Sequence, residues 1–189
     1  MDTEKADPKA GPIQFPFNER KALAAATWLL ARNGRPMNYM RLIKLLYFAD
    51  RMSFQEYGRP ITGDRYVAMK LGPVLSTVFD RVREGEWGGR IRKSGYYVEL
   101  IGPEFTGPLS EAEIGILDEV TQTFRTLDHW KLSDLSHDLP EWKETPNKTS
   151  GDISVESLLR TLGKKSSEIR EIREEALEES FFEEVFSDP

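Results

Sequence analysis

Apolar residues recur every three or four positions along most of this chain, which predicts a protein built mainly from helices. The first such stretch covers residues 19–32, with Asn18 before it as the N-cap and an Asn-Gly pair after it as the stop. The second runs from a cap at Asn38 to about residue 57 and is apolar on more than one side. A helix of that kind is expected in the middle of a domain.

Short runs that suit strands separate some of the helical stretches. Residues 66–70 form one such run, and residues 90–93 and 96–101 flank a Ser-Gly pair, which predicts a β-hairpin. We expect Pro73 to begin a third helix that ends near Gly85, because the first helical position does not need the N–H that proline lacks.

The second half of the chain returns to helical spacing. Ser110 and Glu113 form a capping box that opens a fourth helix. Shorter helices are expected at about residues 132–137 and 154–162, and an acidic helix at residues 166–186. The predicted fold class is α+β, mainly α-helical: a compact helical domain with a short strand and a β-hairpin, plus a C-terminal acidic helix.

The chain divides into three predicted segments. Residues 1–17 contain three prolines and few large apolar side chains, so we expect a flexible N-terminal tail. One domain follows over residues 18–163, and the acidic helix occupies residues 164–189. A chain of 189 residues with 39 % hydrophobic content suits one domain with a single core.

The apolar runs and the lack of cysteine indicate where in the cell the protein is expected. No apolar run approaches the roughly 20 residues that span a bilayer, and the first residues lack the apolar core of a secretory signal. The chain has no cysteine, which excludes disulfides, thiolate catalysis and cysteine-ligated zinc. These observations predict a soluble, cytoplasmic protein.

Charge is unevenly distributed along the chain, whose net charge is −6. Residues 168–189 hold nine acidic and two basic residues, a net charge of −7, which leaves the rest near +1. The acidic end suits either a solvated helix face or a surface for a basic partner. A nearly neutral body argues against nucleic-acid binding, which requires clustered Lys and Arg.

Candidate catalytic groups are few. The two histidines, His129 and His137, do not form a metal-binding HExxH pattern. Ser136, His137 and Asp138 are adjacent, whereas the members of a catalytic triad come from separate segments. The glycine-rich residues 85–89 lack the pattern of a phosphate-binding loop. We therefore predict no enzymatic activity, no cofactor and no metal.

The first two helices could open a helix-turn-helix, with the hairpin as a wing. The best local cluster of bases lies beside that hairpin and consists of Arg81, Arg83, Arg90, Arg92 and Lys93. The second helix is too apolar for an exposed recognition helix, so DNA binding is an alternative interpretation rather than the main one.

Large aromatic residues gather near predicted loops and element ends, where such rings anchor protein interfaces. They are Tyr39, Tyr57, Tyr66, Trp87, Tyr96, Tyr97, Trp130 and Trp142. Each ring alone suits half-buried packing, whereas the set suggests a protein-binding surface.

Four pieces of sequence follow one another in order along the chain: Lys44-Leu45-Leu46-Tyr47-Phe48-Ala49-Asp50, Tyr57-Gly58-Arg59-Pro60-Ile61, Tyr66 through Lys70-Leu71-Gly72-Pro73-Val74, and Leu135-Ser136-His137 with Pro140 and Trp142. Their order and spacing resemble the Panacea domain of the SocA-like antitoxin family. The resemblance covers about residues 20–145. After the tryptophan, family members tend to continue as a helix with basic residues, whereas here Lys143 is followed by Glu144, Thr145 and Pro146.

The resemblance implies an antitoxin of a bacterial or phage toxin–antitoxin system, which neutralises a cognate toxin by direct protein–protein binding. It also implies the residues to examine for partner binding, which are Lys70, His137, Trp142, Tyr47 and Tyr66. Lys70, His137 and Trp142 suit either direct contact or an internal polar network, and Gly58, Gly72 and Pro73 suit structural roles. Three alternatives stay open: a proteolytic adaptor that delivers a toxin to an AAA+ protease, a DNA-binding repressor, and an enzyme dependent on His137.

Overall fold

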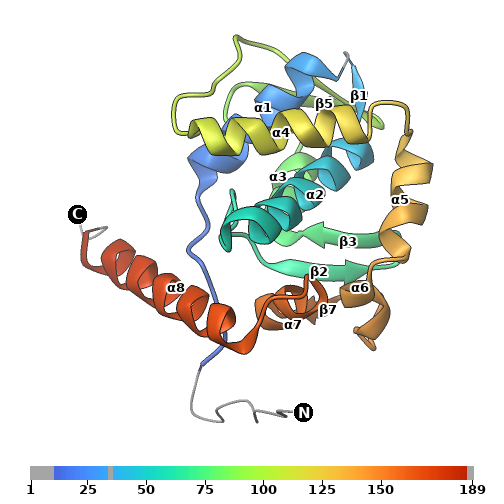
Figure 1. Cartoon of the computed structure of the whole chain (residues 1–189). Helices are drawn as coiled ribbons and strands as arrows, with labels where there is room; N and C mark the ends of the chain where they lie inside the picture. Colours follow the sequence, from blue (N-terminus) through green and yellow to red (C-terminus); the bar gives the residue numbers. More distant parts are fainter. Residues whose placement is uncertain (1–10, 34–35, 187–189) are drawn as a thin grey trace.

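The computed structural model describes residues 11–33 and 36–186, and it confirms an α+β fold made mainly of helices (Figure 1). The helices are α1 (Glu19–Arg32), α2 (Tyr39–Tyr57), α3 (Ser76–Arg83), α4 (Glu111–Thr123), α5 (His129–His137), α6 (Pro140–Glu144), α7 (Val155–Thr161) and α8 (Ser166–Phe186). The strands are β1 (Met37–Asn38), β2 (Tyr66–Met69), β3 (Gly72–Leu75), β4 (Glu86–Trp87), β5 (Ile91–Ser94), β6 (Tyr97–Leu100) and β7 (Gly151–Ile153).

Helix α2 lies at the centre of the domain, as its two-sided apolar pattern predicted (Figure 1). Helices α1, α4 and α5 and strand β3 all pack against it. Asn38 caps its start by accepting a hydrogen bond from the Met40 N–H at 2.9 Å, and Gly58 ends it in the left-handed conformation. Eleven of its 19 residues are buried, which is typical of a core helix rather than of an exposed recognition helix.

Two small antiparallel sheets flank this helix, with strand orders β1-β6-β5-β4 and β3-β2-β7. The predicted β5–β6 hairpin is confirmed. The predicted helix start at Pro73 is wrong, because Pro73 lies in β3 opposite Ala68 and α3 begins at Ser76. Strand β3 is at the edge of its sheet, where a residue without an N–H is tolerated.

The start of α3 depends on a side chain from outside the helix. Its own N-cap residue, Leu75, makes no side-chain hydrogen bond. Asp64 instead accepts hydrogen bonds from the N–H groups of Thr77 (3.0 Å) and Val78 (2.8 Å). A cap supplied by another part of the chain leaves no local pattern, which explains why the start of α3 was placed too early.

Residues 11–18 run along the body of the domain. Ile13 and Phe15 are buried in the main core, and the Phe15 ring meets Phe54 edge to face at 6.0 Å. The Asn18 N–H donates to the Thr62 carbonyl at 2.8 Å. The prediction of a flexible tail through residue 17 is therefore corrected for residues 13–17, because two large apolar side chains anchor them. Residues 1–10 lie outside the described part of the chain.

The C-terminal acidic helix has the predicted bounds, and α8 extends to one side of the domain (Figure 1). Its first turns pack beside residues 11–14 and α7, where Arg173 pairs with Glu156 at 2.5 Å. Within residues 11–33 and 36–186, no helix combines the length and the apolar character needed to cross a membrane.

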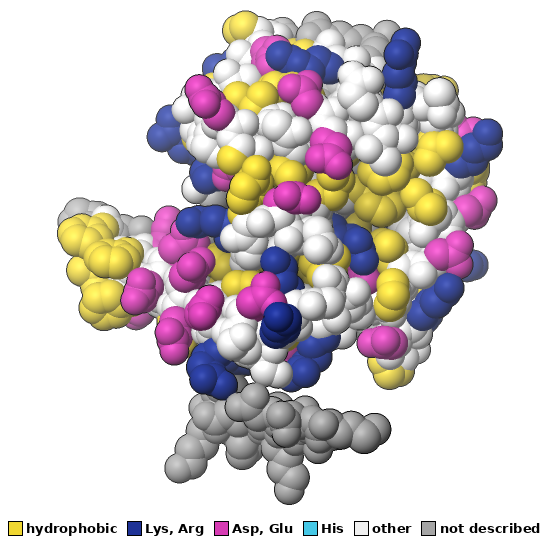
Figure 2. Space-filling model, in the orientation of Figure 1, with side chains coloured by type: hydrophobic (Ala, Val, Ile, Leu, Met, Phe, Trp, Pro, Cys, Tyr) yellow, Lys and Arg dark blue, Asp and Glu magenta, His cyan; other side chains and the backbone are white. Residues whose placement is uncertain are grey.

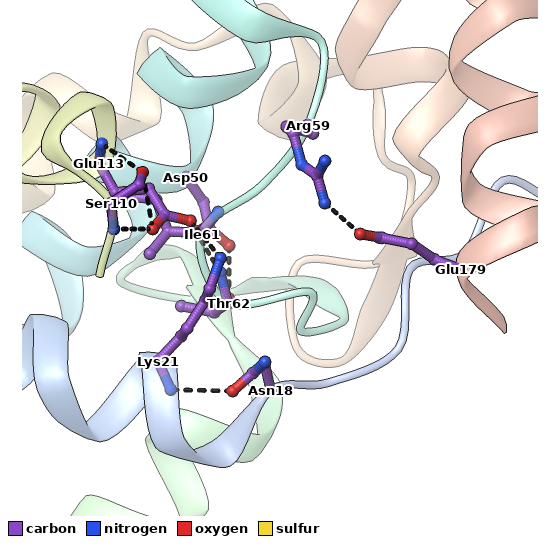
Figure 3. A network of polar contacts seen from close by, with 9 residues as sticks. All are labelled: Asn18, Lys21, Asp50, Arg59, Ile61, Thr62, Ser110, Glu113 and Glu179. Carbon is purple, nitrogen blue, oxygen red and sulfur yellow. Dashed lines mark hydrogen bonds and ion pairs between the residues drawn. The ribbon is translucent and has the colours of Figure 1, made fainter. Parts of the chain in front are cut away.

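Asp50 is fully buried on α2 and ties the following loop to the sheet. One carboxylate oxygen accepts the N–H groups of Ile61 and Thr62 at 3.0 Å each, contacts that Figure 3 shows. The other accepts the hydroxyls of Thr62 (2.5 Å) and Tyr66 (2.9 Å). Burial raises the pKa of Asp50 to about 6, although these hydrogen bonds oppose the shift.

The raised pKa of Asp50 predicts that stability falls as pH rises from about 4 to 6. In that window the folded chain keeps a proton on Asp50 that the unfolded chain has already lost. Across this pH window, the free energy of unfolding of the wild type should fall by on the order of 2–3 kcal/mol relative to that of Asp50→Asn. The asparagine amide oxygen can still accept both N–H groups. Urea unfolding of both proteins from pH 4 to 7 measures this difference. Parallel pH curves would contradict the prediction.

Candidate functional site

The turn between β2 and β3 directs its backbone carbonyls towards helices α2, α5 and α6. Side chains from those helices meet four of these carbonyls, and we call the set of contacts the carbonyl clamp. Its pairs are Trp142 Nε1 with Met69 O (3.0 Å), His137 Nε2 with Lys70 O (3.1 Å), Ser133 Oγ with Leu71 O (2.8 Å) and Lys44 Nζ with Pro73 O (2.8 Å). Because turn carbonyls need hydrogen-bond donors, the clamp fixes the turn against the helices.

Two rings in contact form one side of the clamp. His137 ends α5 and Trp142 lies in α6, which begins with Pro140 at a position where no N–H is needed. The rings of His137 and Trp142 are 4.4 Å apart, so they reach neighbouring carbonyls of one turn. Since the partner of His137 Nε2 is a carbonyl oxygen, this nitrogen carries the proton and donates. The segment after α5 thus forms a short helix that aims Trp142 at the turn.

Lys44 forms the opposite side of the clamp from the middle of α2. Its side chain is fully buried, and within the described residues it has no acidic partner. It donates to the Pro73 carbonyl at 2.8 Å. Burial lowers the pKa of Lys44 to about 7, because the protonated amine loses its hydration.

Gly72 allows the hairpin to approach Lys44 this closely. Its φ is +93°, and a Cβ atom there would lie 2.0 Å from Ser136 Oγ and 2.6 Å from Lys44 Nζ. The Gly72-Pro73 pair therefore marks the point where the hairpin touches both α2 and α5. A side chain at position 72 would force the two sides apart.

A second buried network lies next to the clamp, on Glu141 of α6. Its Oε1 accepts from Tyr47 Oη (3.1 Å) and Arg51 Nε (2.7 Å), and its Oε2 accepts from Thr161 Oγ1 (3.1 Å). These contacts join α2, α6 and α7. Burial, and then the charge of Glu141, raise the pKa of Tyr47 well above its ordinary value, so Tyr47 remains a hydrogen-bond donor.

The five residues predicted for partner binding fall into two groups. Tyr47 and Tyr66 are 0 % and 2 % exposed, and they serve the networks of Glu141 and Asp50 rather than a surface. His137 and Trp142 are half-buried and use their ring N–H groups in the clamp, and the Lys70 side chain is exposed. Direct contact of the last three with a partner stays a prediction.

An apolar surface beside the clamp was only partly visible in the sequence. A hollow of about 110 Å³, which we call the aromatic hollow, is lined by Asn38, Tyr39, Met40, Leu71, Tyr96, His129, Trp130 and Ser133. Tyr96 is 73 % exposed and Trp130 60 %. The aromatic pattern named both rings, but their meeting point depends on the hairpin and α5, which are distant in sequence.

The basic cluster near the β5–β6 hairpin is engaged within the protein. Arg81 pairs with Glu19 (3.1 Å), Arg92 pairs with Glu99 (2.7 Å), Arg90 donates to the Pro103 carbonyl (3.0 Å), and Lys93 lies over the Tyr39 ring (5.4 Å). Arg81 and Arg92, which have acidic partners, attract phosphates less strongly than uncompensated bases. In the described residues, no group of three or more His, Cys, Asp or Glu is placed to hold a metal ion.

Replacing Gly72 by alanine tests the close approach of hairpin and helices. We predict a loss of about 2–4 kcal/mol in the free energy of unfolding, because both the backbone angle and the contacts oppose a Cβ. Gly115 of α4 is the matched control, since a Cβ there meets nothing within 4 Å and alanine should add about 0.5–1 kcal/mol. Urea denaturation compares the two, and equal midpoints for wild type and Gly72→Ala would refute the assignment.

Lys44 predicts a second pH effect, opposite in sign to that of Asp50. The folded chain releases the Lys44 proton near pH 7, whereas the unfolded chain holds it up to the ordinary pKa of 10.5. Stability should therefore rise between pH 7 and 10 in the wild type relative to Lys44→Met. Urea unfolding at several pH values measures the difference, and a constant offset between the proteins would show that the buried amine does not titrate there.

The sequence span that holds the clamp also matches a known family. A family model described as antitoxin SocA-like, Panacea domain, matches residues 42–143, just over half of the chain. No curated protein and no solved structure matches. The matched span contains all four side chains of the carbonyl clamp and the hairpin they hold, whereas α1, α7 and α8 lie outside it. The chain belongs to the SocA-like Panacea antitoxin family.

Proposed function

We propose that this protein neutralises a cognate protein toxin by binding it directly and covering its active or target-binding surface. The observation that carries the proposal is the family match, which spans the central helix and the clamped hairpin. Such neutralisation is stoichiometric and requires no catalytic group. An interface of this kind typically buries about 1,600 Å² in total.

The aromatic hollow and the neighbouring Lys70 are the surface that we propose for toxin contact. Tyr96 and Trp130 are large exposed rings, the type of side chain that anchors interfaces, and Leu71 lines the same hollow. The clamp holds the Leu71 carbonyl through Ser133, so this wall of the hollow is ordered before a partner arrives. Such preorganisation reduces the entropy lost on binding. His137 and Trp142 would then act by holding the turn.

Co-expression tests the proposed function. The neighbouring open reading frame is induced in a sensitive bacterium with and without this chain, and the pair is then purified. We expect growth rescue and a stable complex of the two proteins. Rescue without a complex would favour the adaptor or the repressor alternative, and a toxic neighbour that this chain does not counteract would contradict antitoxin action.

Substitutions then test the proposed surface. Leu71→Asp and Trp130→Ala should each weaken the complex by about 30-fold or more, as expected for residues at the centre of an interface. Ile101→Asp is the matched control, because Ile101 and Leu71 are both 40 % exposed and Ile101 does not line the hollow. Thermal unfolding confirms that the variants are folded. Unchanged affinity in both hollow variants would show that the interface does not include the aromatic hollow.

A further inference from the structure

Helix α8 packs on the body through one side of its first half. Ile169, Ile172 and Ala176 are buried on that side, and Ile172 lies against Gly58 at the end of α2, where a Cβ would be 3.1 Å away. The Arg173–Glu156 ion pair fixes the same region to α7. The first half of α8 is therefore a fixed part of the domain.

The second half of α8 stands beside the body with a hollow between them. Glu179 pairs with Arg59, as Figure 3 shows, and Ser180 Oγ donates to the Gln14 carbonyl at 3.2 Å. The hollow of about 380 Å³ between this part of the helix and the loop of residues 59–63 includes Phe182 in its lining. The helix is thus held in place here with little of its surface covered.

Apolar side chains line the side of this half that faces away from the body. Leu177, Phe181 and Val185 recur every fourth residue and are 60 %, 62 % and 49 % exposed, and we call them the outer stripe. Phe181 follows buried Ile172, and Val185 follows buried Ala176, by nine residues. Nine residues are two and a half helical turns, so the outer stripe lies opposite the packed side.

Two further rings, at the edge of the hollow, continue this apolar surface around the helix. Phe182 and Phe186 are 57 % and 77 % exposed, and their rings stack at 6.1 Å. Figure 2 shows hydrophobic side chains gathered at this end of α8, at the left of the molecule. Isolated exposed apolar residues are common, but five within ten residues of one helix mark an interaction surface.

Carboxylates flank the outer stripe, with Glu178 and Glu184 on its two sides, whereas Glu179 and Glu183 line the hollow towards the body. Residues 177–186 contain Glu178, Glu179, Glu183 and Glu184 and no Lys or Arg. In the described part of the chain, Glu179 is the one member of this group with an ion pair. The surface therefore offers an apolar centre with an acidic rim, which is complementary to an apolar stripe with basic flanks.

Two other occupants fit this chemistry poorly. A second copy of α8 would bring Glu178 and Glu184 of both chains together around the same stripe, and like charges at an interface oppose association. Helices that lie on membranes carry Lys and Arg on the polar face, and anionic headgroups would repel these glutamates.

We propose that residues 177–186 of α8 dock a basic amphipathic helix of a partner protein. Its apolar side covers the outer stripe, and its Lys and Arg residues pair with the glutamates of the rim. Amphipathic helices commonly recognise one another through such a stripe. The surface lies outside the residues matched by the family model, and the inference does not depend on toxin binding at the aromatic hollow.

A labelled peptide tests the docking surface on the full-length chain. The probe is an 18-residue helical peptide with leucine on one side and lysine on the other, followed by fluorescence anisotropy. The test variant is Leu177→Ala with Phe181→Ala and Val185→Ala, because alanine preserves the helix. The matched control is Ile101→Ala with Leu135→Ala, which removes two apolar side chains that are each 40 % exposed on the body and do not line the aromatic hollow.

We expect the wild type and the control to bind the peptide with equal affinity, and the α8 variant to bind about 30-fold or more weakly. Binding should weaken as salt rises, because part of it is ionic. Equal binding by the α8 variant, or equal binding of a peptide with glutamate in place of lysine, would overturn the proposal. Two further results would overturn it. One is a wild-type dimer in sedimentation that the α8 variant does not form, and the other is wild-type binding to anionic phospholipid vesicles that the α8 variant lacks.

Discussion

Turn carbonyls require hydrogen-bond donors, and the β2–β3 turn meets this requirement with side chains from three separate helices. One short turn therefore fixes the central helix, α5 and α6 relative to one another. Lys44 shows how strongly the site is enclosed, since burial lowers the pKa of its amine to about 7 while it still donates to Pro73. Glycine at position 72 is what permits this contact.

The parts of the fold that depend on local sequence were predictable. The bounds of α1, α2 and α8 and the β5–β6 hairpin follow from periodicity, caps and turn residues. The start of α3 was not predictable from local sequence, because its cap comes from Asp64 and because Gly72-Pro73 extends as a strand against β2. The anchoring of Ile13 and Phe15 also depends on a core that distant segments build.

The candidate site was predictable in its residues but not in their roles. The family pattern selects His137, Trp142 and Tyr47, and the structure gives each of them a hydrogen bond inside the protein. Family motif residues can thus specify the scaffold, while Tyr96, Trp130 and the outer stripe, in the surfaces that we propose for binding, lie outside the motif. Such an arrangement allows one scaffold to present different contact residues at the aromatic hollow and along α8.

Hydrogen exchange at the tryptophan indole groups tests the carbonyl clamp most directly. The indole N–H of Trp142 donates to the Met69 carbonyl, whereas Trp130 is 60 % exposed and, in the described residues, its indole has no hydrogen-bond partner. NMR of the native protein should show exchange at Trp142 at least about 100-fold slower than at Trp130. Equally fast exchange at both indoles would contradict a turn held by the clamp.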